Sequence, residues 1–236
     1  MSKKYELTKE KETLADGTVL HRIRALRDIP SFGVKAGELG GFVKGENNLS
    51  QDGDAWVYGN AKVSGDAWVS GNAKVSGNAE VAGDAEVYGD ACVSGNAKVS
   101  GNAKVSDNAW VSGNAEVYGN VWVYGNAKVS GNAKVSGDAK VSGNAKVSGN
   151  AEVYGNAKVE NGHDYFVAKN TWSSLRWFTY TSSNKKWAVG CFYGTGEELI
   201  KKAYADSELS GRCYEAIVHA VETIEAAKAE AKGGAE

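Results

Sequence analysis

A six-residue repeat fills nearly half of this 236-residue chain and constrains its fold more than any other feature. From Gly53 to Glu160 the sequence reads G-[ND]-A-x-V-x eighteen times, without an insertion or a deletion. Two hexads depart from the pattern, with Asp107 in place of Gly and Val121 in place of Ala. So regular a period predicts stacked, repeated units rather than a globular domain with an irregular core.

Each hexad has the composition of one short strand and one corner. The β-branched Val favours a strand and is expected to face inward. The Ala lies two residues earlier and therefore on the same inward side, because side chains alternate along a strand. Gly followed by Asn or Asp is typical of a tight turn that needs a positive φ. Three hexads would form a triangular coil of 18 residues, and eighteen hexads would form six coils stacked into a rod roughly 30 Å long.

This pattern resembles the left-handed parallel β-helix of hexapeptide-repeat proteins, and the resemblance implies the left hand. The segments before the repeat are Lys35-Ala36-Gly37, Gly40-Gly41-Phe42-Val43, Asn48-Leu49-Ser50 and Gly53-Asp54-Ala55-Trp56. They resemble the N-terminus of little-characterised bacterial and phage members of that group. We therefore expect a mainly β protein in which residues 53–160 form the β-helix.

The two flanking regions are expected to form end modules, because the terminal strands of a solenoid expose unpaired backbone. Residues 1–52 should form a small β cap, with strands near residues 4–8 and 18–27. Residues 161–236 should form a ββαα domain, with a hairpin over 176–193. In this interpretation a first helix starts near Thr195, Gly211 breaks it, a second starts near Cys213, and the tail after Ala226 frays.

Residues 18 apart should stack directly, so the position between Ala and Val defines one outward column on each of three faces. We also expect the position after Val to face solvent. The first face reads Trp56, Lys74, Cys92, Trp110, Lys128, Lys146. The second face alternates in charge as Lys62, Glu80, Lys98, Glu116, Lys134, Glu152, which indicates a ladder that aids solubility and register. The third face reads Trp68, Glu86, Lys104, Trp122, Lys140, Lys158.

Exposed tryptophans are the strongest candidates for a contact surface. Trp56 and Trp68 recur 54 residues later as Trp110 and Trp122. The N-terminal cap could cover the first two, but the fourth coil lies beyond its reach. Because Trp and Tyr are enriched at interface cores, we predict that Trp110, Trp122 and Tyr124 mark a subunit or ligand contact.

The C-terminal module holds a second group of aromatic and basic residues. Arg176, Trp177, Trp187 and Tyr193 are candidate binding residues, because aromatic rings beside cations can stack on bases or sugars. Strand alternation should direct about half of the aromatic residues into the module's own core. Cys191, in the second strand of the hairpin, is expected to be buried.

Signs of catalysis are few. Enzymes among the hexapeptide-repeat proteins, such as the trimeric acyltransferases, resemble one another in carrying a histidine base on a loop extruded from the coils. Here the coils have no loop, and His21, His163 and His219 all lie outside them. We therefore predict no catalytic residue, no bound metal and no cofactor.

The net charge of −2 predicts no bulk attraction to nucleic acid or to an anionic membrane. Three dispersed cysteines, a polar N-terminus and the lack of a long apolar run favour a cytoplasmic protein. The leading hypothesis is a phage- or prophage-encoded scaffold or binding protein that forms a trimer or a dimer and binds an unidentified protein or small molecule. The alternatives are an acyl- or nucleotidyl-transferase-like enzyme with an interfacial site, and a protein that sequesters a small ligand between subunits.

Overall fold

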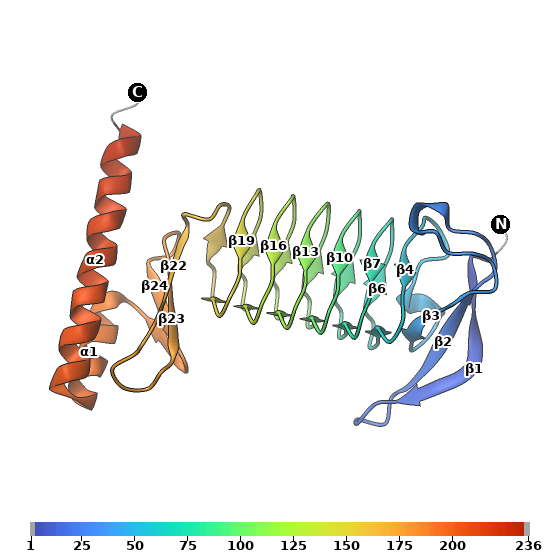
Figure 1. Ribbon diagram of the computed structural model, residues 1–236, viewed down its shortest axis with the longest axis horizontal. Helices are drawn as coiled ribbons and strands as arrows, with labels where there is room; N and C mark the ends of the chain where they lie inside the picture. Colours follow the sequence, from blue (N-terminus) through green and yellow to red (C-terminus); the bar gives the residue numbers. More distant parts are fainter. Residues whose placement is uncertain (1–2, 234–236) are drawn as a thin grey trace.

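The computed structural model describes residues 3–233 and shows a straight rod between two end modules (Figure 1). The N-terminal module lies at one end of the rod and the C-terminal module at the other. The predicted parallel β-solenoid is confirmed for residues 53–160. The coils follow one another in a straight row, so the two modules are held apart by the full length of the rod.

Eighteen two-residue strands, one per hexad, build the rod. They are β4 (Trp56–Val57), β5 (Lys62–Val63), β6 (Trp68–Val69), β7 (Lys74–Val75), β8 (Glu80–Val81), β9 (Glu86–Val87), β10 (Cys92–Val93), β11 (Lys98–Val99), β12 (Lys104–Val105), β13 (Trp110–Val111), β14 (Glu116–Val117), β15 (Trp122–Val123), β16 (Lys128–Val129), β17 (Lys134–Val135), β18 (Lys140–Val141), β19 (Lys146–Val147), β20 (Glu152–Val153) and β21 (Lys158–Val159). Each strand pairs in parallel with the strand 18 residues away, as in Trp110 beside Lys128. The hexads therefore form three sheets that correspond to the three predicted faces.

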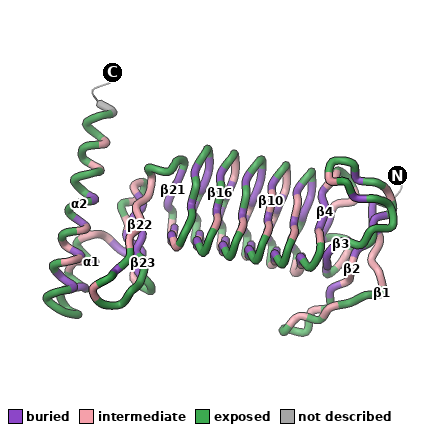
Figure 2. The backbone as a smooth tube through the Cα atoms, in the orientation of Figure 1, coloured by how far each residue is buried: buried purple, intermediate pink, exposed green. Residues whose placement is uncertain are grey.

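The interior of the rod contains only the Ala and Val of each hexad, together with Val121. These side chains are almost completely inaccessible to solvent, and their residues form the purple stretches of the rod's backbone tube in Figure 2. Burying each one stabilises the fold modestly, about 0.8 kcal/mol per methylene-sized group. Because eighteen hexads bury such side chains, their total contribution to the free energy of folding is large.

The corners are close-packed stacks of backbone, which explains the glycine in each hexad. Gly101, for example, has φ +69°, and a Cβ there would lie 2.8 Å from the amide nitrogen of Gly119 in the next coil. Asp107 adopts a φ of 56° despite its side chain, and its carboxylate accepts a hydrogen bond from the Gly125 amide at 3.0 Å. The neighbouring asparagines form ladders in which each carboxamide donates to the next, as from Asn96 to Asn114 at 3.0 Å.

The N-terminal module continues the solenoid. It contains β1 (Tyr5–Thr13), β2 (Val19–Ala25), the 3-10 helices η1 (Pro30–Phe32) and η2 (Glu46–Asn48), and β3 (Leu39–Val43). Strand β3 pairs in parallel with β5, and Leu49 bridges to Val69, so residues 39–52 add most of a seventh turn. Gly40 and Gly41 allow this close approach, because a Cβ on either residue would lie about 2.5 Å from a backbone oxygen of the first coil.

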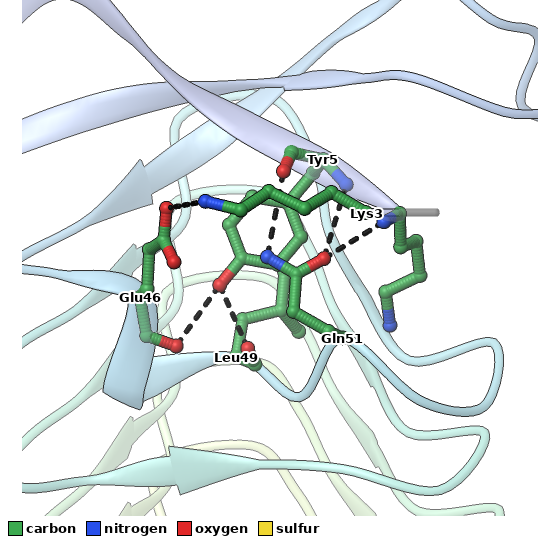
Figure 3. Close-up of polar contacts among 6 residues, drawn as sticks. Lys3, Tyr5, Glu46, Leu49 and Gln51 are labelled. Atoms are coloured by element: carbon green, nitrogen blue, oxygen red, sulfur yellow. Dashed lines mark hydrogen bonds and ion pairs between the residues drawn. The ribbon is translucent and has the colours of Figure 1, made fainter. Parts of the chain in front are cut away.

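A buried lysine closes the end of the rod. Lys4 is inaccessible to solvent, and its ammonium group donates to the carbonyl of Ala55 at 2.9 Å and to those of Asp52 and Gly53 at 3.4 Å. Figure 3 shows the polar contacts beside it, where Gln51 accepts from the Lys4 amide at 2.8 Å and the Tyr5 hydroxyl donates to the carbonyl of Leu49 at 2.7 Å. These contacts satisfy the backbone groups that an uncapped coil would leave unpaired.

The C-terminal module has two more strands than the sequence analysis predicted. An antiparallel sheet contains β22 (Tyr165–Lys169), β23 (Trp177–Thr181), β24 (Lys186–Val189) and β25 (Phe192–Gly194). The expected second strand of the hairpin is divided at Gly190, which has φ 58°. Cys191 therefore lies exposed in a turn, and the prediction that it is buried is wrong.

Two helices, α1 (Gly196–Asp206) and α2 (Glu208–Gly233), follow the sheet. The chain breaks between them at Ser207, and Gly211 lies inside α2. A Cβ at Gly211 would be 2.2 Å from the ring of Tyr204, so this glycine allows the two helices to approach. The predictions that Gly211 ends a helix and that the tail after Ala226 frays are both wrong, since α2 continues to Gly233.

Candidate functional site

The three predicted outward columns are confirmed residue by residue in the strand register. On the first face, Trp56 pairs with Lys74 and Cys92 pairs with Trp110. On the third face, Lys104 pairs with Trp122. The positions after Val are more buried than expected, because Ser70, Ser106, Ser136 and Ser142 are all buried at the edges of the faces.

The N-terminal cap covers only one of the two tryptophans of the first coil. Trp56 is 1% exposed and meets the ring of Tyr5 edge to face, with ring centroids 6.4 Å apart. Trp68 remains 46% exposed. The cap therefore covers the first face and leaves the third face open.

The fourth coil leaves both of its tryptophans uncovered by the rest of the chain. Trp110 on the first face is 49% exposed, and Trp122 on the third face is 45% exposed. Tyr124 follows Trp122 at the edge between these faces and meets its ring edge to face at 6.4 Å. The predicted group of Trp110, Trp122 and Tyr124 thus lies in one coil but on two faces.

Lysines from neighbouring coils lie against these rings. The ammonium groups of Lys104 and Lys140 lie 6.0 and 5.3 Å from the centroid of the Trp122 ring, one coil before and one coil after it. The ammonium group of Lys128 lies 5.1 Å from the centroid of Trp110. Each contact contributes about 0.5–1 kcal/mol at an exposed site and holds the ring in place.

The faces differ in charge. On the second face the described ion pairs join Glu80 to Lys98 at 3.5 Å and Glu116 to Lys134 at 3.8 Å, so opposite charges alternate as predicted. The outward columns of the first and third faces hold six lysines and a single carboxylate, that of Glu86. The basic character of these two columns was not predicted, although the sequence contains the signal, because counting the charges along each column reveals it.

The four predicted binding residues of the C-terminal module have different environments. Trp187 is 2% exposed and packs against Phe178 and Tyr180 in the module's core, so it cannot contact a ligand directly. Tyr193 connects the module to the rod, because its hydroxyl donates to the carbonyl of Tyr154 at 3.2 Å and accepts from the carboxamide of Asn184 at 3.0 Å.

Arg176 and Trp177 lie together at the junction between the module and the second face. With Lys134 and Glu152 they line an open depression of about 300 Å³. Thr179 accepts a hydrogen bond from the Glu152 amide at 2.8 Å, and one oxygen of the Glu152 carboxylate is buried without a partner. Burial raises the pKa of Glu152, although the Lys134 ammonium opposes this shift.

Features of several other functional classes are missing from the described part of the chain. Among residues 3–233, no cluster of three His, Cys, Asp or Glu side chains could hold a metal ion. Neither α1 nor α2 is apolar enough along its length to cross a membrane. His163 is exposed at the end of the rod, and its carbonyl accepts a hydrogen bond from Lys228 at 2.9 Å.

Comparison with known proteins does not assign this chain to a group, because no protein-family model and no curated protein matches its sequence. The interpretation of its function therefore depends on the surfaces described above.

Proposed function

We propose that this chain is a non-enzymatic, cytoplasmic scaffold of phage or prophage origin that acts by binding other protein chains. The rod separates two end modules, and the exposed aromatic residues of the fourth coil form the contact surface. The exposed face of the C-terminal module around Arg176 and Trp177 is a second contact surface. The phage origin rests on the resemblance of the N-terminal segments alone.

The exposure of Trp110 and Trp122 carries this proposal. Half-exposed tryptophans on one coil leave a large apolar area in water, and such clusters are typical of interaction sites. The chain buries the equivalent Trp56 with its own cap, so its fold has the means to cover a tryptophan where no partner does. Lysines around the rings would give such a contact a polar rim, as at many interfaces.

The experiment compares the wild-type chain with the double variant Trp110→Ser, Trp122→Ser by light scattering and by affinity capture. Loss of self-association or of a captured partner in the variant alone, with unchanged thermal unfolding, supports the proposal. Unchanged association in both assays contradicts it.

Thermal-shift screening addresses the alternatives. A scaffold should show no shift with acyl-CoA, nucleotides or sugars. A specific stabilisation by one of these compounds would instead support a transferase-like enzyme or a sequestering protein, with a site between subunits.

A further inference from the structure

The third face of the rod has opposite character at its two ends. Its N-terminal half carries Trp68, Glu86 and Lys104, with Asp66 and Asp84 along the adjoining edge. Its C-terminal half carries Trp122, Lys140 and Lys158, all three of which are exposed. A second copy turned end for end would therefore present lysines to carboxylates and to tryptophans.

We infer that two copies of this chain pair through their third faces with their rods antiparallel. This inference rests on the proposed role of the aromatic residues as a contact surface and names the partner of the third face. A two-fold axis lies between the faces, perpendicular to the rods, at the level between Lys104 and Trp122. Residues of the outward column whose numbers add to 226 then face each other.

This register makes every position of the outward column complementary. Trp68 of one copy faces Lys158 of the other, and Lys104 of one copy faces Trp122 of the other. Both are cation–π pairs between the copies. Glu86, which already pairs with Lys104 of its own chain at 3.0 Å, also faces Lys140 of the other copy and would form a second ion pair there. Because the contact is isologous, each of the three pairs occurs twice.

The edge between the third and first faces is complementary in shape in the same register. Tyrosine and serine alternate along it as Tyr88, Ser106, Tyr124 and Ser142, and both serines are buried between larger neighbours. Antiparallel pairing places Tyr88 opposite Ser142 and Tyr124 opposite Ser106, so each large residue faces a small one. On the opposite edge Asp84 faces Asp138, an exposed like-charge pair that also occurs twice and that solvent screens.

Other arrangements of two rods fit less well. Parallel pairing through the third face would place each residue opposite itself, lysine against lysine. Antiparallel pairing through the first face with Trp110 on the axis would place Lys74 opposite Lys146, and that column contains no carboxylate.

The second face alternates in charge and would also be complementary to itself, but it is already in use within the chain. Lys62 pairs with Glu12 of the N-terminal hairpin at 2.5 Å, and the C-terminal module contacts Glu152. The inner rungs of the second face hold ion pairs of the chain's own, as does the third face, where Glu86 pairs with Lys104 at 3.0 Å. The outward column of the second face also lacks a tryptophan, so pairing there would bury little apolar area.

The size of the third face is sufficient for a specific pair. Six rungs about 4.8 Å apart and a side of at most six residues at about 3.3 Å each give at most about 570 Å² per copy. The total of at most about 1,140 Å² is just above the area of about 1,000 Å² that a specific interface needs. We therefore expect a pair that depends measurably on individual charges.

Exchange of charges tests the pair and its register. Light scattering should show a dimer for the wild-type chain and a shift toward monomer, by at least tenfold in Kd, for Glu86→Lys and for Lys140→Glu. The double variant Glu86→Lys, Lys140→Glu restores both ion pairs and should recover the dimer. Two single variants that dimerise like the wild type, or a double variant that remains monomeric while folded, would overturn the inference.

Cross-linking gives an independent measure of the register. In a background with Cys92, Cys191 and Cys213 replaced by Ser, chains carrying Glu86→Cys are mixed with chains carrying Lys140→Cys and treated with a short bis-maleimide. The mixture should form a cross-linked pair, whereas Glu86→Cys alone should not, because its two copies lie three rungs apart. The second-face mixture of Glu80→Cys with Lys134→Cys is the matched control, and preferential cross-linking there would contradict the inference.

The outcomes separate this inference from the proposed function. A wild-type chain that is monomeric at all concentrations overturns antiparallel pairing. If that monomer still loses a captured partner on replacement of Trp110 and Trp122, the scaffold function stands.

Discussion

Trp56 and Trp110 occupy the same position on the same face of the rod, three coils apart, and differ only in what lies above them. Trp56 is enclosed by Tyr5 and by the turn that Lys4 holds against the first coil. Trp110 contacts Lys128 and solvent. The comparison shows that the repeat fixes where a side chain points, while contacts from outside the repeat decide whether it is structural or available to a partner.

The same comparison on the third face gives a different result. Trp68 lies in the first coil but is as exposed as Trp122, because the cap contacts the first and second faces and leaves the third face open. Proximity to an end module is thus not enough to make a tryptophan structural. The outward column of the third face is at least partly exposed from Trp68 to Lys158, although the Lys158 amide donates to Ser183 of the C-terminal module at 2.7 Å. Its two ends can therefore be compared as surfaces.

The largest expected effect is the difference in stability between Trp56→Ser and Trp110→Ser. Removing the buried indole leaves a cavity beneath the cap and should lower the free energy of unfolding by about 3–5 kcal/mol. Removing the exposed indole should change it by less than about 1 kcal/mol. Urea unfolding followed by tryptophan fluorescence measures the free energy of unfolding of both variants. Equal decreases in this free energy would contradict the described difference between the two sites.

The cap that covers Trp56 should become more stable as the pH rises from 7 to 9. Burial is the main cause that lowers the pKa of Lys4 to about 8, and the nearby Arg27 adds to it. The unfolded chain keeps this proton to higher pH, so the folded state is penalised at neutral pH and relieved as the ammonium group loses its proton. The gain should be roughly 1 kcal/mol.

Unfolding of the wild-type chain at pH 7, 8 and 9 measures this change, and Lys4→Met is the control that should abolish it. A wild-type stability that falls over this interval would contradict the assignment. The measurement should stop near pH 9, because burial raises the pKa of Tyr5 and ionisation of that hydroxyl would oppose folding at still higher pH.

A smaller difference is expected at the corners. Asp107→Gly should stabilise the fourth coil by up to about 1 kcal/mol, because glycine adopts a positive φ without strain, although the bond to the Gly125 amide is lost. Gly101→Ala should destabilise the rod by about 1–2 kcal/mol, since its Cβ would contact the backbone of Gly119. Thermal unfolding checks both variants, because the melting temperature should rise for Asp107→Gly and fall for Gly101→Ala.

Most of the rod could be predicted from the sequence because its contacts repeat every 18 residues. The period alone determines that Val111 is buried, that Trp110 faces outward and that Lys128 is its neighbour. The need for glycine at almost every corner could be predicted from the same repetition. The period could not reveal which outward residues are covered, because Tyr5 and Lys4 lie about 50 residues from the groups that they contact.

The C-terminal module was less predictable for the same physical reason. Alternation along the hairpin correctly indicated that part of its aromatic residues are buried, but the phase was set by the pairing of Tyr180 with Trp187 and by helix α2. Trp187 was therefore wrongly grouped with Trp177 as a surface residue. The charged residues in the same outward column as Trp122 could be read from the sequence. Their role as a contact surface could not, because it depends on the third face being exposed.

The most direct test of the central claim is the mass in solution of the wild-type chain and of Trp122→Ser, measured by light scattering at matched concentrations. The exposed aromatic residues of the fourth coil are expected to hold two copies together, so the wild-type chain should have twice the mass of one 24.9 kDa chain. Trp122→Ser should approach the mass of one chain while unfolding at the same temperature when dilute. Equal masses for the two proteins would contradict the claim.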